Sequence, residues 1–349
     1  MMAEGIITGL GAAFFQSLCY VMARHFVQVR GAGAGRMLLV LGHIWLGIFS
    51  VAMLPFVWPA AGLPVLSMIG PIVWMSVYYM LGQIFFVFAL KRAEPSRASP
   101  LLGLKIAVLA ILVCFFPRAH LRTDPPLQMG LNGMQWAAVA LACAAAVALN
   151  FSGKRLSWRT LGLILLAVIT FALSDWNIKR TIVAVQDALP PGSALRASLI
   201  AVAFCYIFCG LCAVAISPWW GTRSPRDWRN ALPYSVSWLV AMILLYVCFA
   251  LVGPLLGNIL QSTRGLISIL MGSLFAYLGH LHIESESSRG VFFRRLAAGV
   301  LMTGAVSLYV LGDYENSKMR VTRAGARTEK HAWAAHRSNI LPAIDGMIC

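Results

Sequence analysis

Three charged side chains lie inside long apolar stretches of this sequence, where a charge is costly and is usually functional. Lys105 and Arg264 lie about 10 Å and about 14 Å into their apolar runs, if each run is a helix rising 1.5 Å per residue. Asp175 is the acidic residue inside a third run. Cations held away from water bind carboxylate or phosphate groups, so these residues indicate a site for an anionic group.

The roles of the two cations and of the carboxylate each remain open at this point. Lys105 and Arg264 either face a shared cavity, or each reaches the membrane interface or pairs with helix carbonyls. Asp175 either pairs with one of these two cations, holds a proton, or forms an i,i+4 pair with Lys179 on its own helix.

Polar and aromatic residues recur at helical spacing near these charges. Asn258, Gln261 and Ser262 follow the pattern i, i+3, i+4 and therefore share one helix face. Tyr79 and Gln83 are one helical turn apart. A polar cavity with aromatic walls would account for these positions. The full set of candidate binding residues is Lys105, Arg264, Gln261, Asn258, Tyr79, Gln83, Tyr20, Trp176 and Asp175, with Trp238 as a further aromatic wall.

The composition shows what kind of environment positions these residues. Of the 349 residues, 60% are hydrophobic and 11% are charged, whereas soluble domains carry about 25% charged residues. A soluble globular enzyme and a disordered chain are both excluded. The net charge of +16 comes from cations in short loops between apolar runs, which favours contact with a lipid bilayer over nucleic-acid binding.

Ten apolar segments of membrane-spanning length are predicted, and they show no two-residue alternation. The first is too long for a signal peptide and lacks a basic start. The eight cysteines have no paired spacing, so we expect free, packed thiols. The fold class is therefore an all-α membrane protein. The segments are 3–24, 37–58, 69–90, 98–116, 135–151, 159–178, 195–217, 232–252, 255–280 and 292–312.

The chain also repeats itself with a shift of about 160 residues, as secondary transporters with inverted repeats do. The run FQSLCYVMAR at 15–24 resembles FALSDWNIKR at 171–180, and Lys105 and Arg264 are separated by the same shift. Because five helices is an odd number, the second copy must enter the membrane in the opposite orientation. We expect ten transmembrane helices as two inverted five-helix repeats. The first repeat is 1–152, the second is 153–312, and 313–349 is a basic mobile tail.

Three runs and two aromatic residues resemble the EamA-like family of the drug/metabolite transporter superfamily. The runs are ALKRAEPSRASPLLGLKIAVLAIL at 89–112, FALVGPLLGNILQSTRGLISILMG at 249–272 and RRLAAGVLMTGAVSLYVLG at 294–312, and the aromatics are Tyr20 and Trp176. The family often has a Gly-Glu pair after the fourth and ninth helices. Here FFPRAH and Gly279-His280 stand in its place.

The resemblance implies a secondary transporter that moves a small organic metabolite by alternating access, with the fourth and ninth helices lining the cavity. The solute would be anionic or zwitterionic and amino-acid-like. The alternative is a membrane-embedded enzyme that acts on lipid-linked substrates. Such an enzyme needs clustered acids and histidines at one membrane face, and the run His280, His282, Glu284 and Glu286 is the one candidate.

No catalytic residue, metal ligand or cofactor motif is predicted. The glycines at 31–35 follow no strand, and Cys205, Cys209 and Cys212 are better explained as small residues at a helix contact. The expected partners are the solute and the lipid bilayer, without nucleic acid, and a homodimer is left open. The expected location is a multi-pass position in a membrane, which in a prokaryote would be the plasma (inner) membrane.

Overall fold

The structure is a computed structural model that describes most of the apolar part of the chain. It describes residues 2–31, 33–90, 101–115, 131–150, 157–220, 224–264, 304–312 and 314–316, together with 267, 271, 290, 293, 297, 300 and 301. All regular structure in these residues is helical. The helices are α1 (Met2–Arg30), α2 (Ala34–Val57), α3 (Val65–Leu90), η1 (Leu102–Leu104), α5 (Lys105–Phe115), α6 (Gly133–Asn150), α7 (Trp158–Gln186), α8 (Ala194–Trp220) and α9 (Pro225–Ser262).

Six of these helices, α1, α2, α3, α7, α8 and α9, are long and apolar enough to cross a membrane. Helices α5 and α6 are apolar but shorter. The described part of the chain is therefore all-helical, and its six long apolar helices are those of a helical membrane protein. Most of the predicted segment 255–280 beyond residue 264, and the first part of the segment 292–312 apart from single residues, lie outside the described residues.

Helix α9 contains the predicted segment 232–252 and the first residues of the segment 255–280, and it is broken between the two. Gly253 has φ 81° and ψ 165°, which is far from helical geometry, and this positive φ favours glycine. The next residue, Pro254, has no N–H to donate within the helix. We call residues 225–252 the first part of α9 and residues 254–262 its second part.

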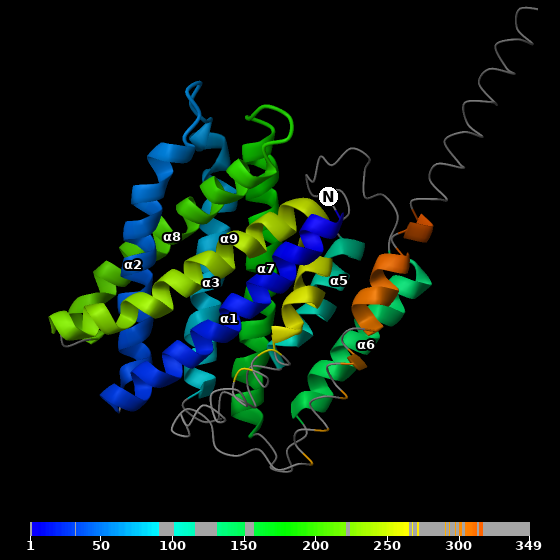
Figure 1. Cartoon of the computed structure of the whole chain (residues 1–349), viewed down its shortest axis with the longest axis horizontal. Helices are drawn as coiled ribbons and strands as arrows, with labels where there is room; N and C mark the ends of the chain where they lie inside the picture. Colours follow the sequence, from blue (N-terminus) through cyan, green and yellow to red (C-terminus); the bar gives the residue numbers. More distant parts are fainter. Residues whose placement is uncertain are drawn as a thin grey trace, which may run out of the picture.

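Side chains tie neighbouring helices together at both ends of the bundle. At one end, Arg30 in the last turn of α1 pairs with Asp227 in the first turn of α9. At the other end, Arg196 donates to the carbonyls of Val57 and Trp58, at 2.8 and 2.9 Å, where α2 finishes. The loops before α3 and before α8 lie at this same end of the molecule (Figure 1).

Helices α2 and α8 cross at a pair of glycines, Gly47 and Gly210, near the middle of each helix. A Cβ atom on Gly210 would lie 2.9 Å from the Cα atom of Gly47, and one on Gly47 would lie 3.1 Å from that of Gly210. Only glycine allows two helix backbones to approach this closely. The other two most extensive helix contacts are α1 with α9 and α3 with α7.

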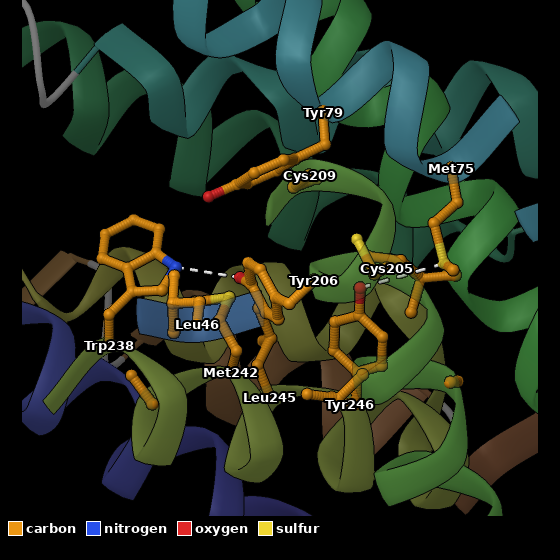
Figure 2. Packing of buried hydrophobic residues seen from close by; sticks show 14 of the residues in the cluster. Leu46, Met75, Tyr79, Cys205, Tyr206, Cys209, Trp238, Met242, Leu245 and Tyr246 are labelled. Atoms are coloured by element: carbon orange, nitrogen blue, oxygen red, sulfur yellow. Dashed lines mark hydrogen bonds between the residues drawn. The ribbon is translucent and has the colours of Figure 1, made fainter. Parts of the chain in front are cut away.

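The largest buried cluster is formed by residues of α1, α2, α3, α7, α8 and α9. Figure 2 shows Trp238 pointing to Tyr206, whose hydroxyl accepts a hydrogen bond from the indole Nε1 at 2.8 Å. Cys205 and Cys209 face α3 from α8, and both are free thiols. Every cysteine in the described part of the chain is free, as expected.

Helix α6 packs beside the helical residues 304–312, at the side of the bundle (Figure 1). Asn132 donates to the carbonyl of Gly312 at 2.7 Å, and Asn316 donates to Gln135 Oε1 at 3.2 Å. Residues 314–316 are helical, so ordered structure runs beyond the expected boundary at 312. The remainder of the expected tail lies outside the described residues.

Candidate functional site

Four of the predicted binding residues form one buried polar cluster. The Lys105 ammonium lies 3.1 Å from Asp175 Oδ2 and donates to Gln261 Oε1 at 2.8 Å. Asn258 Nδ2 donates to the same Asp175 oxygen at 2.9 Å. The residues come from α5, α7 and the second part of α9, and each is at most 9% exposed. We call Lys105, Asp175, Asn258 and Gln261 the ion-pair cluster.

The surroundings of the ion-pair cluster are apolar. Ile106, Leu109, Leu256 and Ile259 are fully or almost fully buried in the hydrophobic cluster that contains Trp176. An ion pair away from water is stable only when its remaining hydrogen-bonding groups are also satisfied. The Asn258 and Gln261 amides provide these additional hydrogen bonds.

Lys105 begins α5 instead of lying inside a continuous helix. The preceding residues, Leu102–Leu104, form a 3-10 turn, and the α-helix runs from Lys105 to Phe115. The predicted depth of about 10 Å assumed an unbroken α-helix with 1.5 Å rise per residue, and this assumption is wrong here. Lys105 is nevertheless only 9% exposed. It is shielded from water by the surrounding helices and not by its distance from the start of its own helix.

The side-chain amide of Asn258 has an oxygen that accepts no hydrogen bond from the described residues. Its Nδ2 atom donates both to Asp175 and to the carbonyl of Pro254, the latter at 2.8 Å. The oxygen, Oδ1, is also buried. A buried acceptor without a donor is destabilising, and it is satisfied when a donor enters the site.

Arg264 lies beyond the ion-pair cluster, next to α1. Its guanidinium donates to Gln16 Oε1 at 3.0 Å and lies 5.9 Å from the centre of the Tyr20 ring. The side chain is half-buried, and its positive charge repels the Lys105 ammonium. Lys105, Arg264 and Asp175 together carry one net positive charge.

The other aromatic candidates lie elsewhere. The Tyr79 hydroxyl is 3.2 Å from His43 Nε2, and its ring packs at 5.9 Å against that of Tyr206. Tyr79 therefore belongs to the cluster between α2, α3 and α8. Gln83 is half-buried one turn further along α3. Trp176 is 7% exposed and packs among apolar residues beside the ion-pair cluster.

Two buried polar residues, Gln16 and His43, were missed by the sequence analysis, and Lys179 was considered there only as a partner of Asp175. Gln16 is 2% exposed and contacts Arg264, and His43 is 4% exposed and contacts Tyr79. Lys179 is 6% exposed and donates to the carbonyl of Ala250 at 2.9 Å. Gln16 and His43 lie within the predicted segments 3–24 and 37–58, and Lys179 directly follows the segment 159–178. A polar residue in or beside an apolar run is the signal that could have found them. Asp175 pairs with Lys105, and the alternative pair with Lys179 is not formed.

No group of three potential metal ligands occurs among the described residues. The run from His280 to Glu286 lies outside them. The arrangement that the structure does describe suits recognition of a charged group by hydrogen bonds and opposite charge.

Comparisons with known proteins bear on the fold alone. No family model matches the chain, and no curated protein matches it. Among solved structures, 27 chains are similar. One of them, described only as "Crystal structure of protein", has a TM-score of 0.58 and 16% sequence identity, over 89% of this chain and 98% of that chain. The fold therefore occurs in another protein of nearly the same extent.

Proposed function

We propose that this protein is a secondary transporter that moves a small organic metabolite, anionic or zwitterionic, by alternating access. The observation that supports this most directly is the buried Lys105–Asp175 ion pair with Arg264 beside it. Charged groups buried in an apolar helical bundle are costly and usually line a path for a polar solute. The EamA-like resemblance points to the same class of protein.

Charge balance favours a ligand that carries a carboxylate or phosphate. Lys105 and Arg264 exceed Asp175 by one positive charge, and an anionic group near Arg264 would neutralise this excess. Planar guanidinium groups bind carboxylates and phosphates through two parallel hydrogen bonds. A hydrogen-bond donor on the same solute, such as an ammonium or hydroxyl group, would satisfy Asn258 Oδ1. An amino-acid-like solute has both features.

The proposal includes ten spans in two inverted five-helix repeats. Helices α1 and α3 of the first half correspond to α7 and the first part of α9 in the second half. The contact of α1 with α9 is then equivalent to that of α7 with α3, and α2 meets its own counterpart, α8. The close contact of Gly47 with Gly210 lies where a two-fold axis relating the halves would pass. This pattern of contacts supports the repeat.

Labelling of introduced cysteines tests the repeat. The loop between α1 and α2 and the loop between α7 and α8 are equivalent, so inverted repeats place them on opposite sides of the membrane. Gly35→Cys and Pro191→Cys both change exposed residues at these loops. In a cysteine-free background, a membrane-impermeant maleimide added outside cells should label only one of the two. Labelling of both from one side would exclude the inverted arrangement.

Solute flux tests the function. Purified protein is first screened by thermal shift against organic acids, phosphate esters and amino acids, and stabilising compounds are then tested for uptake into proteoliposomes. Uptake should depend on the protein and should be lost in Arg264→Ala. Arg159→Ala, which removes an exposed cation at the start of α7, is the matched control and should retain uptake. Binding without any flux would favour a receptor over a carrier.

A further inference from the structure

The break in α9 leaves a main-chain carbonyl without its helical donor. In a continuous α-helix the carbonyl of Ala250 would accept from the N–H of residue 254. That residue is Pro254, which has no N–H, and Gly253 before it has a positive φ of 81°. A carbonyl in an apolar interior requires another hydrogen-bond donor, because an unpaired carbonyl there destabilises the fold by roughly several kcal/mol.

Lys179 provides that partner. Its ammonium donates to the carbonyl of Ala250 at 2.9 Å, and the residue is 6% exposed. Asp175, one turn earlier on α7, accepts from Asn258 in the second part of α9. Helix α7 therefore contacts α9 on both sides of its break, with a cation on one side and a carboxylate on the other.

Two simpler roles for Lys179 do not fit these contacts. A lysine that reaches the membrane interface keeps its ammonium in water, whereas this ammonium is hydrogen-bonded to a carbonyl on another helix. An i,i+4 ion pair with Asp175 would hold the ammonium on its own helix. Asp175 instead pairs with Lys105.

Carbonyls freed by a broken membrane helix are suitable ligands for a small monovalent cation. An ammonium group has the same charge and can donate a hydrogen bond where such an ion would coordinate. We propose that the Lys179 ammonium is a tethered cation that occupies a monovalent-cation position at the break of α9. The chain thus carries its own cation there, and the position needs no dissolved ion. This inference does not depend on transport activity.

Replacement of the tethered cation by a free one tests the proposal. Lys179→Ala removes the side chain beyond Cβ, and n-propylammonium has the same three carbons and ammonium group. The variant in detergent should melt at a lower temperature than the native protein, and n-propylammonium chloride should restore most of the loss. Tetramethylammonium chloride at equal ionic strength should not, because it has no N–H and is bulkier. Equal responses to the two salts would overturn the proposal.

Lys179→Met is the matched control because it keeps an unbranched stem of similar length without the charge. It should lose stability as Lys179→Ala does, but n-propylammonium should not restore it, since the methionine side chain fills the space. A Lys179→Met protein that melts at the native temperature would refute the role of the charge.

A second background keeps the proposal testable if Lys179→Ala does not fold. Gly253→Ala with Pro254→Ala allows α9 to continue, so that the backbone N–H of residue 254 can reach the carbonyl of Ala250. In this background Lys179→Met should lower the melting temperature less than it does in the native protein. An equal loss in both backgrounds would show that Lys179 does not act through the break.

Discussion

The Lys105 ammonium lies 3.1 Å from the Asp175 carboxylate, and both residues are more than nine-tenths buried. The two residues come from helices α5 and α7, far apart in the sequence. Their pairing joins the short helix α5 to the bundle and places Gln261 and Asn258 around a shared charge.

Breaking this pair from one side should be costly. Lys105→Met leaves the carboxylate buried without its cation, and Asp175→Asn leaves the ammonium without its carboxylate. Each variant should lose about 3–5 kcal/mol of unfolding free energy, as other broken buried pairs do. The double variant should be more stable than the sum of the two losses implies, since it leaves no unpaired charge. Reversible unfolding in mixed micelles measures all four proteins, and additive losses would contradict the pair.

Arg264 should matter more for ligand binding than for folding. It is half-buried, and its guanidinium has one hydrogen bond, to Gln16, given by the structure. Arg264→Ala should reduce stability by about 1.5–3 kcal/mol, the usual contribution of a hydrogen bond to a charged group, while uptake falls to background. Arg264→Lys should recover little uptake, because an ammonium lacks the planar pair of donors. Full uptake by Arg264→Ala would remove this residue from the site.

The glycine contact between α2 and α8 should not tolerate a side chain. Gly210→Ala places a Cβ 2.9 Å from the backbone of Gly47, so the two helices must move apart. Overpacking of this kind costs about 1–3 kcal/mol. Gly162→Ala is the control, since a Cβ there meets no atom within 4 Å and should leave stability unchanged or slightly raise it. Thermal melts of both variants in the same detergent provide the comparison.

The boundary of the folded C-terminal end should lie at Asn316. A chain that stops after Asn316 keeps the hydrogen bond from this residue to Gln135. A chain that stops after Asp313 loses it and should be less stable by about 1 kcal/mol, the typical value of one such bond. The sequence predicts that the whole tail 313–349 is dispensable, whereas the structure places residues 314–316 in a helix. The chain that stops after Asn316 should therefore melt close to the full-length temperature. Equal melting of the two shortened chains would move the boundary back to 312.

Much of the helical framework could be predicted because it depends on local composition. Long apolar runs must form helices in a bilayer, where every backbone group needs a partner within its own segment. The division between the predicted segments 232–252 and 255–280 falls at Gly253 and Pro254, where α9 is broken. Lys105, Asp175 and Arg264 could be selected as candidates from the sequence, since a charge in an apolar run is conspicuous without any structure.

The partners of these side chains depended on tertiary structure. Asp175 could pair with Lys179 on its own helix or with a cation on another, and local spacing favours the former. The packing of α5 and α9 against α7 brings Lys105 to Asp175 and leaves Lys179 beside the free carbonyl of Ala250. Tyr79, which resembled a wall of the same site, contacts His43 instead. Helical periodicity states which face a residue occupies, but it does not state which helix lies opposite that face, and the energy of a buried charge depends on that neighbour.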